Sequence, residues 1–135
     1  MELMEGIRIR KFGRDDAEEV STLIRKCLLE VNSRDYTKEE INFMIKNFEA
    51  ERLIKKSRKR AIFVALHKGR IVGVAGAERN EVHNVFVLPE MHGKGIGRML
   101  MERAEEVIRE HGYKYAEVAS SITACLLYTS PSPRD

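Results

Sequence analysis

The sequence is poor in the residues that mark several classes of protein. It has two cysteines, three prolines and no tryptophan in 135 residues. Two cysteines are too few for a disulfide framework, and no stretch approaches the ~18 consecutive apolar residues of a membrane span. The net charge of +3 is too small to argue for a nucleic-acid partner. The short acidic start, residues 1–5, has no apolar run behind it, so we expect neither signal peptide nor membrane anchor and predict a cytoplasmic protein.

The residues that are present have the composition and patterning of one folded domain. Hydrophobic residues make up 43% of the chain and charged residues 33%, an ordinary globular balance. Apolar runs predict strands at 7–12, 61–66, 71–77, 81–88 and 113–119. Apolar stripes at helical spacing predict helices over 20–31, 41–54 and 96–108. Asp15 or Asp16 can cap the first helix, and Thr37 with Glu40 has the pattern of a capping box.

The order of these elements predicts a mixed α/β fold. The three consecutive strands between residues 61 and 88 should form an antiparallel meander. The helix that follows should lead, by a right-handed crossover, to a strand parallel to the last strand of the meander. We therefore expect an α+β mixed sheet with helices on its faces, in the order β-α-α-β-β-β-α-β.

Three further features concern packing and charge. Gly73 and Gly76 lie inside a predicted strand, where glycine indicates a bulge or a close backbone approach. Cys27 lies within an apolar helical stripe, so we expect a small core residue rather than a reactive thiol. The basic run at residues 55–60 favours a solvated helix end, because its cations suit the helix dipole and no aromatic residues interleave them. The competing hypothesis, a nucleic-acid patch, predicts steep salt dependence.

The end of the chain departs from the rest. Residues 125–135 are rich in serine and proline and continue no helical or strand period. Their sequence resembles, codon for codon, the conceptual translation of a transposase-type sequencing adapter. We therefore expect an incomplete native domain over residues 1–124 and a non-native tail over residues 125–135.

The most informative motif is a glycine-rich turn between the strand at 81–88 and the next helix. Glycine accepts positive φ and lets a ligand approach the backbone, and the first amides of a helix have no internal acceptor. A pyrophosphate placed there would accept several charge-assisted hydrogen bonds. The spacing excludes a Walker loop, because Lys94 is followed by Gly95, not Ser or Thr. It also departs from the dinucleotide fingerprint, whose glycines are spaced Gly-x-Gly-x-x-Gly and follow a first parallel strand.

This motif resembles the hallmark of the GNAT superfamily of N-acetyltransferases, Arg/Gln-x-x-Gly-x-Gly/Ala between the fourth strand and the next helix. Gly95 and Gly97 match the two small positions. His92 stands where Arg or Gln is usual. The order of elements from residue 7 to residue 119 also matches, and the family's final helix and strands are missing.

The resemblance implies acetyl-CoA as cosubstrate and no metal. It implies that the CoA pyrophosphate is held by the amides of a seven-residue turn, His92, Gly93, Lys94, Gly95, Ile96, Gly97 and Arg98. The backbone of Phe86 and Val87 would pair with the pantetheine arm like an added strand. Ser120 and Ser121 would border the gap in which the arm lies.

The resemblance also suggests where proton transfer occurs. Glu81 corresponds to the carboxylate base that some members carry early on this strand. His83 lies two residues further and shares its face, so either residue, or a water between them, is a candidate base. The family's usual general acid is a tyrosine after the fifth strand, a position beyond the expected native sequence. Tyr128 lies in the adapter-like tail and is not given that role.

The resemblance predicts acetyl transfer from acetyl-CoA to a primary amine of a small molecule or protein. The alternative is a non-catalytic acyl-CoA-binding or regulatory module of the same fold. We expect no membrane or nucleic-acid partner, and the sequence leaves a homodimer open. The chain as written can be inactive if its catalytic machinery is incomplete.

Overall fold

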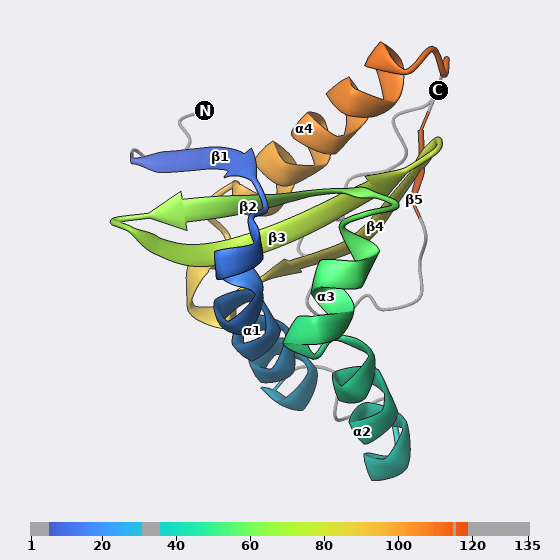
Figure 1. Cartoon of the computed structure of the whole chain (residues 1–135). Helices are drawn as coiled ribbons and strands as arrows, with labels where there is room; N and C mark the ends of the chain where they lie inside the picture. Colours follow the sequence, from blue (N-terminus) through green and yellow to red (C-terminus); the bar gives the residue numbers. More distant parts are fainter. Residues whose placement is uncertain (1–5, 31–35, 115, 119–135) are drawn as a thin grey trace.

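The computed structural model describes residues 6–30, 36–114 and 116–118. Five strands form one sheet in the order β1-β2-β3-β4-β5. Their bounds are β1 Ile7–Lys11, β2 Ala61–His67, β3 Arg70–Glu78, β4 Glu81–Val87 and β5 Glu117–Val118. The helices are α1 Ala17–Glu30, α2 Lys38–Asn47, α3 Ala50–Lys56 and α4 Ile96–Glu110, with short 3-10 turns at Arg14–Asp16 and Pro89–Met91. Helices α1 and α3 lie on one face of the sheet and α4 on the other (Figure 1).

The predicted topology is confirmed. Strands β2, β3 and β4 form an antiparallel meander. After α4, strand β5 pairs parallel to β4, with Glu81 opposite Glu117 and Val82 opposite Val118. Within the described residues, β5 covers Glu117–Val118 of the predicted strand at 113–119, and Gly112, with φ of 95°, turns the chain after α4. The two hairpin turns also form as expected, with positive φ at Lys68, Gly69 and Arg79.

The predicted helix over 41–54 is wrong, because two helices occupy this segment. The capping box of Thr37 and Glu40 starts α2 as predicted, with reciprocal hydrogen bonds of 3.0 and 2.8 Å. Helix α2 then ends at Asn47, and α3 begins at Ala50. Between them Phe48 is buried and packs edge-on against Phe86, with ring centroids 5.7 Å apart. The break lets this ring reach the sheet.

The predicted cap at Asp15 or Asp16 also needs correction. A 3-10 turn precedes α1, and the carboxylate of Asp16 accepts hydrogen bonds from the N–H of Gly13 at 2.7 Å and from both terminal nitrogens of Arg10 at 2.8 and 3.0 Å. Because Asp16 is buried, these three hydrogen bonds compensate the loss of water around its carboxylate. This cluster fixes the connection from β1 to α1.

Both glycine predictions in β3 are informative. At Gly73, an added Cβ would lie 2.9 Å from the Leu100 side chain and 3.3 Å from the Phe86 carbonyl oxygen, so α4 approaches the sheet closely here. A bulge is present on the neighbouring strand. Val74 pairs with Phe86 and Gly76 pairs with His83, so two residues of β4 face one residue of β3.

Candidate functional site

The turn between β4 and α4 has a backbone that requires glycine. Strand β4 ends at Val87, and a 3-10 turn covers Pro89–Met91. Gly93 and Gly95 then have φ of 81° and 84°. Residues other than glycine rarely adopt these left-handed backbone angles. Gly95 is the N-cap of α4, so the helix starts directly from the turn.

The start of α4 can receive an anion. The N–H of Met99 donates to the carbonyl oxygen of Gly95 at 3.1 Å. The amides of the three preceding helical residues, 96–98, therefore have no acceptor inside the helix. The first turn of α4 contains no acidic residue, while Lys94 and Arg98 are exposed beside it. An added Cβ at Gly93 would meet no atom within 4 Å. Backbone donors, helix dipole and open space thus agree with a phosphate-holding turn.

His92 connects this turn to the end of β4. Its backbone N–H, predicted to bind the pyrophosphate, instead donates to the carbonyl oxygen of Pro89 at 3.2 Å, so that part of the prediction is wrong. Its Nε2 lies 3.0 Å from the carbonyl oxygen of Val87. A carbonyl only accepts, so Nε2 carries the proton of this bond. The same oxygen accepts a hydrogen bond from the thiol of Cys27 at 3.4 Å. Cys27 is buried, which confirms the predicted core position.

The two backbone positions expected to pair with the pantetheine arm face different edges of β4. Leu88 N–H donates to Val72 O at 3.0 Å. Because peptide groups alternate along a strand, the polar groups of Phe86 also face β3, opposite Val74, while those of Val87 face the other edge. On that edge β5 pairs with β4 only at Glu81 and Val82 within the described residues.

Glu81 and His83 form a pair at the start of β4. Glu81 Oε1 lies 3.1 Å from His83 Nε2. The side chain of Glu81 is half exposed and that of His83 is 20% exposed, so the pair lies at the surface of the sheet. Across the strand, Glu78 is opposite Glu81 and forms an ion pair with Arg60 at 3.1 Å. The structure therefore brings the two predicted base residues into direct contact.

Sequence reasoning missed a charge cluster behind the turn. The carboxylate of Glu90 contacts Lys26 at 3.3 Å and Arg70 at 2.9 Å. Its pKa is lowered, first by a hydrogen bond from its own backbone N–H and then by these two cations. Glu90 thus links the turn to α1 and to the start of β3. In the sequence, only the position of Glu90 next to Pro89 could have suggested that it lies at the boundary between a strand and a turn.

Some predicted positions lie outside the described residues. Ser120 and Ser121 are among them, as is the whole segment 125–135. Among the described residues, no group of three or more His, Cys, Asp or Glu side chains is arranged to hold a metal ion. Within the same residues, no helix has the length and apolar character needed to cross a bilayer.

Comparisons with known proteins agree on one family. Residues 32–130 match the family model described as "Acetyltransferase (GNAT) domain". An uncharacterized N-acetyltransferase of Archaeoglobus fulgidus is 29% identical over 123 residues, which cover 83% of this chain and 80% of that protein.

Solved structures show the same fold. The PaiA N-acetyltransferase of Thermoplasma acidophilum, crystallised with coenzyme A, superimposes on this chain with a TM-score of 0.70 at 23% sequence identity. The superposition covers 78% of this chain and 74% of the PaiA chain. A GCN5-related N-acetyltransferase of Rhodopseudomonas palustris, also described as a class-II aminotransferase, gives a TM-score of 0.75 at 16% identity, covering 84% and 72%. The α+β architecture predicted from the sequence is therefore confirmed.

Proposed function

Because this chain belongs to the GNAT acetyltransferase family, whose domain model matches residues 32–130, we propose that it transfers an acetyl group from acetyl-CoA to a primary amine. The observation that carries the proposal is the turn before α4. It combines two left-handed glycines, a helix start without acidic residues, and adjacent Lys94 and Arg98. An anion of the size of pyrophosphate gains most at such a helix start.

The proposed roles of the turn and strand follow from their backbone. The amides of residues 93–98 bind the pyrophosphate, because the His92 N–H already donates to the carbonyl oxygen of Pro89 at 3.2 Å, and Lys94 and Arg98 add charge. The polar edge of Val87 faces the arm of the cofactor, while Phe86 serves by packing because its peptide faces β3. Ser120 and Ser121, which lie outside the described residues, are the proposed border of the gap for the pantetheine arm. When bound, acetyl-CoA supplies an activated thioester carbonyl to the amine.

The Glu81–His83 pair is the proposed base. An amine must be neutral to attack, and at pH 7 this costs about 4.6 kcal/mol for a lysine-like amine with a pKa near 10.4, but about 1.4 kcal/mol for an α-amine with a pKa near 8. When His83 Nε2–H donates to Glu81, the His83 Nδ1 and the second Glu81 oxygen both remain as acceptor atoms for the proton. A water between the pair and the amine would extend their reach.

We further propose that residues 125–135 are not native. The abrupt change of composition supports this, although the family match extends to residue 130, inside that segment. The complete open reading frame tests it. A frame that continues differently after Ala124 is the expected result. A genomic frame that encodes residues 125–135 as written would overturn it.

The proposed function is tested by incubating two proteins with acetyl-CoA and a broad amine panel. One is this chain of 135 residues, and the other is the product of the complete open reading frame. We expect amine-dependent release of free CoA thiol. Cofactor binding without thiol release from either protein, over the whole panel, would favour the acyl-CoA-binding module instead. Absence of both binding and release would overturn both functions.

A further inference from the structure

The segment at residues 49–60, which contains α3 and the turn after it, is strongly basic. It holds six lysine and arginine residues and two glutamates. Four of the six cations are exposed, and we call them the basic patch: Arg52, Lys55, Arg58 and Lys59. Among the residues that the structure describes, none of these four forms an ion pair with a carboxylate. Their charges are therefore open to a partner.

The patch forms one stripe along the segment. Arg52 and Lys55 lie three residues apart on α3, and Lys59 follows four residues later. The N–H of Arg58 donates to the carbonyl oxygen of Lys55 at 3.1 Å, so the helical course continues beyond the end of α3. Residues three and four apart are neighbours on a helical surface. The four cations thus act on the same region of solvent.

The other two cations of the segment are used internally. Lys56 Nζ lies 5.3 Å from the centre of the Phe48 ring, and Arg60 forms an ion pair with Glu78 at 3.1 Å. Leu53 is buried in the core beneath the segment. These contacts hold one side of the segment against the sheet, so the basic patch has a fixed support.

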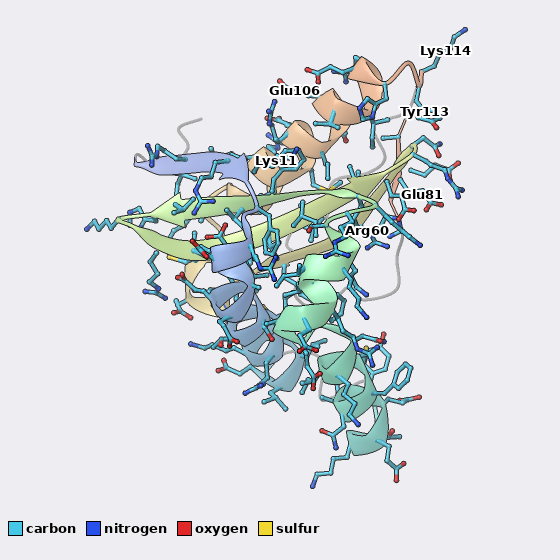
Figure 2. The ribbon with its side chains drawn as sticks, in the orientation of Figure 1. Lys11, Arg60, Glu81, Glu106, Tyr113 and Lys114 are labelled. Atoms are coloured by element: carbon cyan, nitrogen blue, oxygen red, sulfur yellow. The ribbon has the colours of Figure 1, made fainter. Side chains whose placement is uncertain are left out.

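The basic segment ends beside the proposed base. Its last residue, Arg60, pairs with Glu78, and Glu78 lies directly opposite Glu81 in the sheet. Directly paired residues project to the same face. Figure 2 shows Arg60 and Glu81 at the same end of the sheet. An acceptor amine at Glu81 and His83 would therefore lie next to the end of this segment.

The order of charges along this surface selects a type of acceptor. Glu81 and the exposed Glu117 lie opposite each other on β4 and β5, where they attract a protonated amine. The basic patch begins on the other side of Arg60, where it attracts acidic groups. An extended peptide spans about 3.3–3.6 Å per residue. Acidic side chains a few residues from the amine would thus reach the patch.

We propose that the basic patch is a docking surface for an acidic stretch of a polypeptide acceptor, whose amine lies at Glu81 and His83. This inference rests on the proposed acetyl transfer, and it narrows the acceptor to a protein or peptide amine with aspartate or glutamate close to it. Charge complementarity of this kind sets specificity and the rate of encounter. A nucleic acid fits less well, because no aromatic residue lies within 49–60 to stack on bases.

The experiment measures kcat/KM of the product of the complete open reading frame with matched peptides. Each pair has aspartate and glutamate, or asparagine and glutamine, at the three positions after the amine. One set has a free α-amine and no lysine, and the other has a blocked α-amine and one lysine. We expect the acidic peptide of at least one set to be preferred by about tenfold at low salt, since each exposed ion pair contributes a few-fold at most.

Salt separates this preference from an uncharged one. The Debye length is about 30 Å at 0.01 M salt and about 3 Å at 1 M. The acidic and neutral peptides should therefore become nearly equal in kcat/KM at about 1 M salt. A preference of unchanged size at high salt would overturn the electrostatic docking.

Variants assign the preference to the patch. The double variant Lys55→Gln, Lys59→Gln should reduce the preference to about threefold or less, through KM for the acidic peptide, and leave the neutral peptide nearly unaffected. Arg58→Gln with Lys59→Gln replaces it if that variant fails to fold, because both positions follow the last residue of α3.

The matched control is Arg8→Gln with Lys68→Gln. It removes the same charge from exposed positions near the hairpin between β2 and β3, at the opposite end of β3 from Glu81. This control should keep the full preference. A control that loses as much of the preference as the patch variants would overturn the assignment to the patch.

Equal kcat/KM for acidic and neutral peptides in the wild type at low salt would overturn the docking surface and leave acetyl transfer standing. So would an oligonucleotide that binds the patch with steep salt dependence while the two peptides of each pair react equally. Failure of every peptide and every small amine to release CoA thiol would instead overturn the proposed function, and the docking surface with it.

Discussion

His92 Nε2 donates a hydrogen bond to the carbonyl oxygen of Val87 at 3.0 Å, and so joins the glycine-rich turn to the last residue of β4. The thiol of Cys27 uses the same oxygen. A carbonyl oxygen has two lone pairs, and both then have a donor. A ligand that runs along this edge therefore finds the N–H of Val87 rather than its carbonyl. His92 takes the place of the family's usual Arg or Gln, and all three side chains can donate at this position.

The first prediction concerns this bond. His92→Leu leaves the Val87 oxygen with one donor and releases the turn from the strand, so we expect CoA affinity to fall about tenfold, the cost of roughly one hydrogen bond. His92→Gln keeps a donor, and its affinity should remain within about twofold of the wild type. Calorimetric titration with CoA measures both. Equal affinity of the Leu and Gln variants would show that the bond does not position the turn.

The second prediction concerns packing of α4 on the sheet. Gly73→Ala places a methyl group 2.9 Å from the Leu100 side chain and 3.3 Å from a backbone oxygen. We expect a loss of about 1–3 kcal/mol in the free energy of unfolding, as for other overpacked cores. Urea denaturation measures it.

Gly76→Ala is the matched control in the same strand, because its nearest contacts would lie at 3.4 to 3.6 Å. It should change the free energy of unfolding much less than Gly73→Ala. A larger loss of unfolding free energy for Gly76→Ala than for Gly73→Ala would contradict the packing described for Gly73.

The third prediction concerns pH and stability. The Asp16 pKa lies below its usual value of 3.8, first because Arg10 donates to the carboxylate and then because Gly13 does. A carboxyl with a lowered folded-state pKa stabilises the fold above its unfolded-state pKa, and this stabilisation is lost as pH falls through the folded-state value. Asp16→Asn should cost about 1–2 kcal/mol at pH 7, because Arg10 is partly exposed and water screens the pair.

The difference between Asp16→Asn and the wild type should shrink as pH falls below the usual Asp pKa of 3.8 and through the lower folded-state pKa, because the wild-type carboxyl becomes protonated. Asp15→Asn, a change at an exposed neighbour, is the control and should be nearly neutral. Chemical denaturation at pH 7 and at low pH gives both values. A pH-independent difference would show that the charge of Asp16 is not what stabilises the connection.

The fourth prediction concerns proton transfer. The double variant Glu81→Gln, His83→Gln should lower kcat by about a hundredfold or more, the usual range for loss of a general base, and leave CoA affinity unchanged. Glu106→Gln, a change at an exposed carboxylate that pairs with Arg103 on α4, is the control. Unchanged turnover in the double variant would leave neither residue as base.

The sequence predicted the topology well because periodicity and turn residues are local. Lys68 and Gly69 predict the hairpin turn that they form, and Thr37 with Glu40 predicts the start of α2. The break at Phe48 was missed because its cause is the distant ring of Phe86. For the same reason the bond between His92 and Val87 became visible only in the folded chain. Spacing placed Glu81 and His83 on one face, and the structure added their 3.1 Å contact.

The central claim is that the turn at residues 92–98 holds the pyrophosphate of CoA. Calorimetric titration of this chain with CoA and with pantetheine, which lacks the pyrophosphate and nucleotide, tests it most directly. We predict one CoA per chain, bound at least about tenfold more tightly than pantetheine, since each charge-assisted bond contributes roughly 1.5–3 kcal/mol. Equal affinities for the two ligands, or no binding of CoA, would contradict the claim.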